Sequence, residues 1–377
     1  MQIVAAGEFG GAEAQILALI QALKPHPVDV QVVTFYEAEF SKRAKALGVK
    51  VETLISHTPV QDFWQVCRAA KSMRPSIIHT HGVRASLAGR FAGAVLGIPV
   101  VTTVHSDLFY DYATLLKRAM MMGLEHVTRD LSSRVIAVSR ALSRKLDGRG
   151  YSVEQLVVIP NGLDGERMKL AQEEARQYPV PLKRGLGIPD DAYVAIAVAR
   201  LQPVKNLPFL IRAIEGVKEV GDRPLHLVLV GDGPERMAIE RQVEAVATRE
   251  GKHRIHLLGE RNDVISLLME VDVLILPSVM EGMPISILEA MACALPVIAS
   301  QVGGIPDLVH TKEDGETGML FPVSDEHALQ EALRELLPNG KRREMMGKHA
   351  VLRVQQEFST LSLGKKVYEV YQNVTNK

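Results

Sequence analysis

The sequence predicts an α/β protein made of two domains, each built around a parallel β-sheet. At 377 residues, the chain is longer than the roughly 250–300 residues at which a single hydrophobic core stops growing. Short apolar, β-branched runs alternate with helical stretches in both halves, and this alternation is typical of βαβ units. Between the halves, residues 165–190 are charged, contain three prolines and lack strand periodicity, as a linker does. We therefore expect an N-terminal domain over residues 1–168 and a C-terminal domain over residues 185–359.

The expected elements follow in chain order. In the first half, strand-like runs lie at residues 1–5, 28–35, 76–80, 99–105, 134–139 and 156–160. In the second half, they lie at residues 193–199, 225–231, 255–259, 271–277, 296–300 and 319–321. The tail over residues 361–374 carries Leu363, Val367, Val370 and Val374 at helical spacing, which predicts an amphipathic helix.

Composition narrows the class of protein. The formal net charge is zero, which argues against nucleic acid as the main partner. The two cysteines, Cys67 and Cys293, lie in apolar helical context and give neither a disulfide framework nor a metal-ligand cluster. The first residues contain no apolar h-region of the secretory kind, so we expect no secretory leader. No apolar run reaches the length of about 18 residues that a membrane-spanning helix needs. We expect a protein of the reducing cytoplasm.

The most informative motif is the run at residues 281–289. It follows an apolar strand and opens a helix, so it lies at the carboxyl edge of a parallel sheet, where ligands bind. Gly282 lets backbone approach a ligand, and Pro284 suits the first helical turn. The backbone amides around Met283, Ile285 and Ser286 would then face an anion.

The two carboxylates of this run suggest a nucleotide sugar as the ligand. Glu281 precedes the helix and Glu289 lies inside it, so the phosphates would meet the helix end while hydroxyls meet the carboxylates. The alternative is an ordinary turn in which Glu281 caps the helix and Glu289 is solvated.

Two further loops carry candidate binding groups. Arg200 and Lys205 follow the strand at residues 193–199 and can converge on a pyrophosphate, the arginine as a fork and the lysine as a point charge. Each alone would be an ordinary solvated cation. Gly10 and Gly11 lie at the first strand-to-helix turn, where they allow approach to a phosphate or an acceptor hydroxyl; a tight turn is the alternative.

Three histidines end two neighbouring strands. His79 and His81 close one, and His105 closes the next. We expect His79 and His81 to point to opposite faces of their strand, which disfavours joint ligation of zinc. The alternative for these two is a hydrogen bond to nearby backbone.

With these motifs in view, the chain resembles the retaining glycosyltransferases of the GT-B fold, family GT4. The run at residues 281–289 is similar to the family signature E-G-x-P-x-x-x-x-E. Supporting similarities lie at residues 10–13 (G-G-A-E), 159–164, 199–206 (with Ala199 for the usual glycine), 231–235, 259–261 and 302–307. Members of the family usually have more apolar residues before the first loop, so either the first strand is short or the true start lies upstream.

The resemblance implies two Rossmann-like domains facing across a cleft, with residues 360–377 crossing back to the N-terminal domain. It places the acceptor in the first domain and the donor in the second. Glu289 would hold the ribose hydroxyls, Glu281 a sugar hydroxyl, and His105 would lie near the transferred sugar.

The same resemblance implies that the loop at Gly231 lies along the donor. It also implies that backbone groups near Arg261 contact the edge of the base. The activity implied is transfer of a hexose-type sugar from a UDP- or GDP-linked donor to a hydroxyl acceptor, with retention, in cell-surface polysaccharide or glycolipid synthesis. Because Arg200, Lys205 and the helix start can neutralise the leaving diphosphate, we expect no metal cofactor.

Other activities remain open. A glycoside hydrolase would use Glu281 and Glu289 as its acid and nucleophile, but it gives Arg200 and Lys205 no role. A non-catalytic nucleotide-sugar-binding protein would keep the phosphate groups without turnover. A GT-B epimerase would consume its donor without an acceptor.

The segment at residues 115–127 suggests where the acceptor is met. Leucines, methionines and a valine at helical spacing accompany Lys117, Arg118 and His126. An apolar helix with flanking cations can lie in a lipid interface, so we expect a lipid-linked or saccharide acceptor and peripheral contact with the inner face of a membrane. Alternatively, the methionines pack against a core or line an adaptable acceptor groove.

Overall fold

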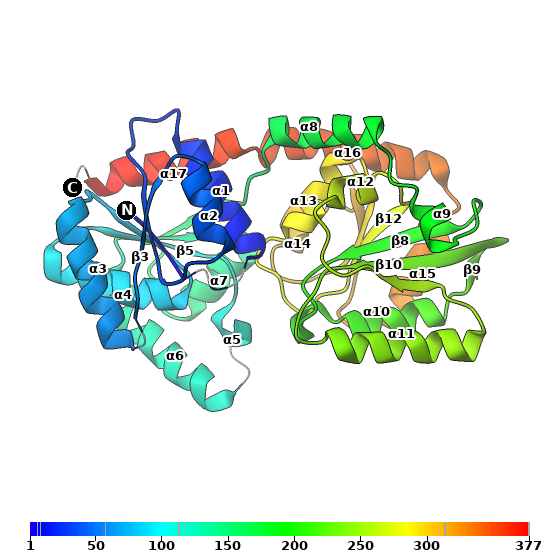
Figure 1. Ribbon diagram of the computed structural model, residues 1–377, viewed down its shortest axis with the longest axis horizontal. Helices are drawn as coiled ribbons and strands as arrows, with labels where there is room; N and C mark the ends of the chain where they lie inside the picture. Colours follow the sequence, from blue (N-terminus) through cyan, green and yellow to red (C-terminus); the bar gives the residue numbers. More distant parts are fainter. Residues whose placement is uncertain (6, 8, 57, 112–113, 313, 376–377) are drawn as a thin grey trace. The chain divides into compact units, whose positions relative to one another are not determined.

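The computed structural model describes residues 1–5, 7, 9–56, 58–111, 114–312 and 314–375, and for Asp111 only the backbone. Its internal contacts divide the chain into two units (Figure 1). The first unit comprises Met1–Gly162 and Ser359–Lys377, and the second comprises Leu163–Phe358. Each unit is an α/β layer structure with its own parallel sheet.

In the first unit, the described residues form a seven-stranded parallel sheet of order β3-β2-β1-β4-β5-β6-β7. The strands are β1 (Gln2–Val4), β2 (Gln31–Thr34), β3 (Lys50–Thr53), β4 (Ile78–His81), β5 (Val100–Val104), β6 (Arg134–Ala137) and β7 (Leu156–Val158). The helices are α1 (Gly11–Leu23), α2 (Glu39–Ala46), α3 (Pro59–Met73), α4 (Val83–Leu96), α5 (Leu108–Asp111), α6 (Leu115–Thr128), α7 (Arg140–Gly148) and α17 (Thr360–Thr375), with a 3₁₀ turn at Arg129–Leu131. The strand order reverses between β1 and β4, and a ligand site is expected at the carboxyl ends of such a pair.

Small residues let helices lie close to this sheet and to one another. A Cβ atom added to Gly89 of α4 would lie 2.4 Å from Thr80 Cγ2 of β4. On α17, a Cβ atom at Gly364 would lie 2.3 Å from the carbonyl oxygen of Ala22. The C-terminal helix therefore packs directly on α1, as the resemblance implied, and its apolar face joins a core cluster with Leu19, Leu23, Val101 and Ile136.

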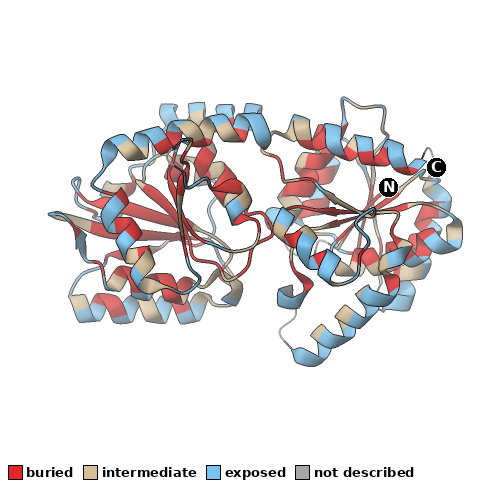
Figure 2. Cartoon of the chain, turned by 180° about the vertical axis from the view of Figure 1, so that it is seen from behind, coloured by how far each residue is buried: buried red, intermediate tan, exposed pale blue. Residues whose placement is uncertain are grey.

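In the second unit, the described residues give the strand order β11-β10-β8-β12-β13-β14, all parallel, with β9 antiparallel to β10. The strands are β8 (Tyr193–Val198), β9 (Glu219–Val220), β10 (Arg223–Val230), β11 (Ile255–Leu257), β12 (Val273–Leu276), β13 (Val297–Ser300) and β14 (Gly318–Phe321). The helices are α8 (Gly165–Gln177), α9 (Leu182–Leu186), α10 (Leu207–Glu215), α11 (Arg236–Glu250), α12 (Val264–Leu268), α13 (Ile285–Ala292), α14 (Ile305–Leu308), α15 (Glu326–Leu336) and α16 (Gly340–Glu357), with a 3₁₀ turn at Pro203–Lys205. Both sheets are buried along most of their length (Figure 2).

Each strand expected from the sequence is present, with ends shifted by a few residues. Two strands escaped prediction. β3 is a partly exposed strand of sequence KVET, whose charges hide any apolar alternation, and β9 has only two residues. Residues 165–190, which read as a linker, form α8 and α9 and are assigned to the second unit, where α8 packs against α12.

Candidate active site

In the second unit, four loops meet at the carboxyl edge of the sheet. Backbone hydrogen bonds tie them together: Leu201 N–H donates to the carbonyl of Asp232 (2.9 Å), and Val279 N–H donates to that of Val204 (2.9 Å). Gly304 N–H donates to the carbonyl of Glu281 (3.2 Å). The loops that carry the candidate cations and the candidate carboxylates therefore form one connected surface.

Two glycines make this close contact possible. Gly231 has φ +138°, and a Cβ atom there would lie 2.0 Å from the carbonyl oxygen of Ala199. Gly303 has φ +52°, and its Cβ would lie 1.7 Å from the carbonyl oxygen of Glu281. Because only glycine adopts such φ values without strain, both positions are fixed by the loops that they contact.

Lys205 and Glu281 form an ion pair at the centre of this surface. Lys205 Nζ lies 2.6 Å from Glu281 Oε1, and the Ser278 hydroxyl donates to the same oxygen at 2.6 Å. The Glu281 side chain is 8% exposed and the Lys205 side chain 21%. The two residues lie 76 positions apart in the chain, and neither this pair nor the supporting Ser278 was predicted. Arg200 lies half-buried in the same loop as Lys205.

The helix after β12 begins one residue later than expected. Pro284 is the residue just before α13, with φ −72° and ψ 125°, rather than part of the first turn. Gly282, Met283 and Pro284 are buried, whereas Ile285 and Ser286 are half-buried. The first amides of α13 still start at the end of the loop that carries Glu281, where a helix presents its unpaired N–H groups and the positive end of its dipole.

Glu289 lies in the middle of α13 and is only partly exposed. Burial raises the pKa of its carboxyl to about 7, and Arg167 of α8 partly opposes that rise. Glu289 is therefore partly withdrawn from water, which disfavours the alternative of a solvated side chain. Arg261 follows β11 and pairs with the Asp263 carboxylate through two bonds of 2.8 and 2.6 Å.

In the first unit, Gly10 and Gly11 start α1. Gly10 is the N-cap with φ −153° and ψ −165°, an extended backbone that other residues also adopt. Its N–H donates to Glu13 Oε2 at 3.1 Å. The capping by Glu13 was not predicted, although a glutamate three residues after a helix start is a known signal.

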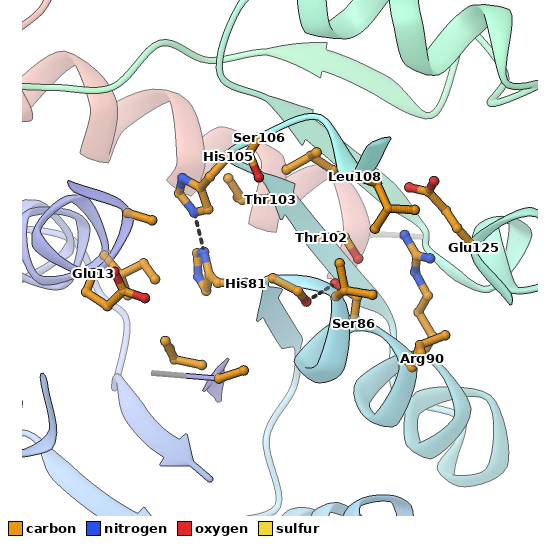
Figure 3. A pocket seen from close by; sticks show the side chains of 18 residues that line it. Glu13, His81, Ser86, Arg90, Thr102, Thr103, His105, Ser106, Leu108 and Glu125 are labelled. Atoms are coloured by element: carbon orange, nitrogen blue, oxygen red, sulfur yellow. Dashed lines mark hydrogen bonds between the residues drawn. The ribbon is translucent and has the colours of Figure 1, made fainter. Parts of the chain in front are cut away.

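A pocket of about 150 Å³ lies at the carboxyl edge of this sheet. Its lining includes Glu13, His81, Arg90, Thr103, His105 and Glu125, and Figure 3 shows these side chains around it. Arg90 is buried and donates to three neutral hydroxyl groups, those of Thr128, Ser132 and Tyr151. The pocket thus combines imidazole, guanidinium and carboxylate groups.

The expectation that His79 and His81 point to opposite faces is wrong. They are two residues apart, and strand side chains alternate with a period of two, so both point to the same face with ring centroids 4.3 Å apart. His81 Nδ1 lies 3.1 Å from His105 Nε2, which brings all three imidazoles together. Their partners are side chains rather than backbone.

These imidazoles are neutral at neutral pH. Burial lowers the pKa of His79 to about 3 and that of His105 to about 4, and it lowers the pKa of His81 well below its usual value. Both ring nitrogens of His79 are already bonded, to Tyr371 and to Thr103. Over the described part of the chain, no three His, Cys, Asp or Glu residues are arranged to hold a metal ion.

The helix expected over residues 115–127 is α6, and its apolar residues face solvent. Within α6, Thr128 alone is buried, while Leu115, Leu116, Met120 and Val127 are 76, 82, 56 and 76% exposed. The alternative in which Met120 packs against a core is therefore wrong. Across the residues that the structure describes, no helix is both long and apolar enough to cross a bilayer.

Comparison with known proteins finds a matching family model for each of the two units. Residues 9–167 match the model of Glycosyltransferase Family 4, and residues 181–353 match that of Glycosyl transferases group 1. Among curated relatives, an Escherichia coli UDP-Gal:alpha-D-GlcNAc-diphosphoundecaprenol alpha-1,3-galactosyltransferase is 29% identical, covering 80% of this chain and 76% of its own. A D-inositol 3-phosphate glycosyltransferase of Salinispora tropica is 27% identical, covering 97% of this chain and 81% of its own.

Solved structures share the fold along the whole chain. The Anabaena protein HepE in complex with UDP-glucose superposes with a TM-score of 0.82 at 23% identity, covering 99% of this chain and 100% of its own. WaaG, a glycosyltransferase involved in lipopolysaccharide biosynthesis, gives a TM-score of 0.73 at 18% identity, covering 98% and 99%.

Proposed function

The chain belongs to the GT4 family of glycosyltransferases and has the GT-B fold, and on that premise we propose that it is a retaining hexosyltransferase. Its donor is a UDP- or GDP-linked sugar, and its acceptor is a hydroxyl group on a saccharide or a lipid-linked intermediate of cell-surface glycan synthesis. The observation that carries the proposal is the Lys205–Glu281 ion pair, held at the carboxyl edge of the second sheet.

The chemistry requires a nucleoside diphosphate to leave an anomeric carbon, so negative charge grows on the leaving phosphate. Lys205 and Arg200 lie on one loop beside the start of α13, and together they supply two cations and a set of backbone amides. Oriented charges and amides of this kind stabilise a developing anion without reorganising. In the unliganded protein, the Glu281 carboxylate keeps the Lys205 ammonium ordered; when the diphosphate takes that ammonium, Glu281 is released to bind a sugar hydroxyl.

Glu289 is proposed to hold the ribose. It lies about one helical turn after Ile285, the first residue of α13. Its side chain is partly buried and the pKa of its carboxyl is raised. A carboxylate accepts hydrogen bonds from two neighbouring hydroxyls at once, which matches a ribose. Backbone near Gly259 and Arg261 would then contact the base, and Gly231 would allow the chain to pass the donor closely.

A uridine nucleotide is the better supported donor. The Escherichia coli relative is named for UDP-Gal, and HepE was solved with UDP-glucose. The same relative is named for a diphosphoundecaprenol acceptor, which supports a lipid-linked acceptor here. We propose that α6, with its outward apolar face, contacts the membrane in which such an acceptor lies.

A donor screen tests the function directly. UDP- and GDP-sugars are compared by thermal shift, and each hit is assayed for release of nucleoside diphosphate with and without acceptors. Binding of a nucleotide sugar together with acceptor-dependent release of the diphosphate supports the transferase. Binding without turnover would favour a non-catalytic binding protein, and conversion of the donor without acceptor would favour an epimerase. Free sugar released from a simple glycoside would favour the hydrolase.

A further inference from the structure

A continuous chain of hydrogen bonds links the C-terminal helix to His105. Tyr371 of α17 lies at its centre: its hydroxyl is 2.8 Å from Gln2 Nε2 and 2.6 Å from His79 Nδ1. Gln2 Oε1 is 2.8 Å from His81 Nε2, and His81 Nδ1 is 3.1 Å from His105 Nε2. On the other side, His79 Nε2 is 2.7 Å from the Thr103 hydroxyl.

Every residue of this hydrogen-bond network is buried except His105, which is partly exposed. Each of its ionisable side chains is neutral at neutral pH. Burial lowers the histidine pKa values, and it raises the pKa of Tyr371 above its ordinary value. In a neutral imidazole, one ring nitrogen donates and the other accepts. Each hydrogen bond in the chain therefore dictates the direction of the next.

The direction follows from the Gln2 amide. Its Nε2 donates to the Tyr371 hydroxyl, so its Oε1 faces His81 and must accept from a protonated Nε2 there. His81 Nδ1 is then an acceptor, and His105 must donate to it from Nε2. The remaining nitrogen, His105 Nδ1, is left as a bare acceptor, and it is buried without a hydrogen-bond partner among the described residues.

We propose that Tyr371 is a positioning residue for the active site: by holding the Gln2 amide with its Nε2 toward α17, it keeps His105 in the Nε2–H tautomer, with Nδ1 as an acceptor. If the Gln2 amide turned over, all the bonds between Tyr371 and His105 would reverse, and His105 Nδ1 would become a donor. Only the place of His105 beside the transferred sugar depends on the proposed transferase activity; the tautomer itself does not.

The hydrogen bonds of Tyr371 join the C-terminal helix to the start of β1 and to β4. Gln2 and Tyr371 are 369 residues apart, and Gly364 lets α17 approach α1 closely enough for the Tyr371 ring to reach β1 and β4. Packing on α1 alone would need only apolar residues such as Val367 and Val370. The buried hydroxyl adds a polar group whose burial is favourable only if it is fully bonded.

The first test is spectroscopic and needs no substrate. Protein labelled with ¹⁵N-histidine is examined by long-range ¹H–¹⁵N correlation near neutral pH, with the His105 signals assigned from a His105→Asn variant. We expect the Nε2–H tautomer in the wild-type protein and a mixture in Tyr371→Phe. Tyr368→Phe is the matched control, because Tyr368 lies on the same helix and its hydroxyl bonds only the exposed Gln372 side chain in the described structure; it should leave His105 unchanged. An Nδ1–H tautomer in the wild type, or an unchanged His105 in Tyr371→Phe, would overturn the proposal.

The second test is kinetic, with the donor identified by the screen. Tyr371→Phe should lower kcat about ten-fold, equivalent to about 1.4 kcal/mol, with little change in the KM for the donor. In a His105→Ala background, the same substitution should have no further effect, because the two residues act as one unit. Additive losses would mean that Tyr371 acts by another route. If no donor is found, the spectroscopic result still decides the tautomer.

Discussion

At the scale of single residues, Lys205 and Arg200 are proposed to bind the leaving diphosphate. Their replacement should therefore lower turnover much more than it lowers the stability of the fold. Replacing either by alanine removes one cation facing the leaving diphosphate, and losing one such group typically costs about 10²-fold or more in kcat. Both side chains lie partly exposed at a loop surface, so we expect much smaller changes in the melting temperature. Steady-state assays on Lys205→Ala and Arg200→Ala measure the loss.

The controls for this prediction are Lys341→Ala and Arg241→Ala, at exposed positions on α16 and α11. They should leave turnover unchanged. Near-normal turnover in both Lys205→Ala and Arg200→Ala would contradict the proposal that these side chains bind the leaving diphosphate.

Glu289 gives a prediction about pH. The ionised carboxylate is the form that accepts hydrogen bonds from ribose hydroxyls, and the pKa of this carboxyl is about 7. Nucleotide affinity should therefore weaken as the pH falls from about 8 to about 6, and Glu289→Gln should bind more weakly than wild type at about pH 8 with little pH dependence left. Calorimetric titration with UDP-glucose, which lacks the terminal phosphate that titrates at about pH 6 in UDP, tests it across this range. A wild-type affinity independent of pH would contradict it.

The same group changes stability in the opposite sense. Its pKa in the folded protein is raised above the ordinary value of 4.5, so as pH rises from about 4.5 to 7 the unfolded chain releases this proton before the folded one does. The unliganded wild type therefore loses stability over that window. Glu289→Gln lacks this loss, and its melting temperature relative to wild type should rise between about pH 5 and pH 8.

At the scale of elements, the loop after β13 is constrained by its contact with the loop after β12. Gly303→Ala would place a methyl group against the carbonyl oxygen of Glu281 and force alanine to φ +52°. Left-handed φ alone costs about 1–2 kcal/mol, and the backbone clash adds to it, so we expect a lower melting temperature and disturbed donor binding. Gly185→Ala in α9 meets no atom within 4 Å and has no positive φ. It should be neutral or slightly stabilising, and equal effects of the two substitutions would contradict the constraint.

The helix α6 predicts a membrane contact. Leu116, Met120 and Val127 lie on its outward side together with Ala119 and Gly123, and charged neighbours flank this stripe. Wild-type protein should co-sediment with anionic liposomes at low salt, since screening weakens the attraction of its cations at high salt. Leu116→Glu with Met120→Glu should abolish co-sedimentation.

The matched control for α6 is Leu361→Glu, which changes an exposed leucine of α17 that is 72% exposed. It should bind liposomes as wild type does. If wild-type protein stays in solution at low salt and instead sediments as a dimer, the stripe on α6 covers a second copy of the chain.

At the scale of the whole molecule, the sequence predicted the two parallel sheets well because their strands are buried, β-branched and regularly spaced. The residues at the carboxyl edges could also be named, since Glu281 and His105 follow the ends of β12 and β5 and so lie at that edge of a parallel sheet. The contacts between distant side chains could not be predicted, because Lys205 meets Glu281 and Gln2 meets Tyr371 only through the tertiary fold. The error on His79 and His81 came from misapplying the strand period, because residues two apart in a strand point to the same face. The sequence held the information needed to avoid it.

Metal independence also belongs to this scale, because it depends on the whole set of charges around the donor. Two cations and the amides of α13 are expected to neutralise the diphosphate without an ion. Activity should persist in excess EDTA. Complete loss, with recovery on adding Mn²⁺ or Mg²⁺, would require a metal in the mechanism.

The return of α17 to α1 has a consequence for the order in which the protein is made. Residues Leu163–Phe358 form the second unit as one uninterrupted stretch, so this unit can fold as soon as it leaves the ribosome. The first unit waits for α17, which is synthesised after the whole second unit, before Tyr371 and the apolar face of that helix are in place. Maturation of the two units should therefore run against the usual N-terminal-first order. Chains that end before residue 360, and that are held on the ribosome by a spacer long enough to bring residue 358 out of the exit tunnel, should protect the second unit from protease while the first remains cleavable.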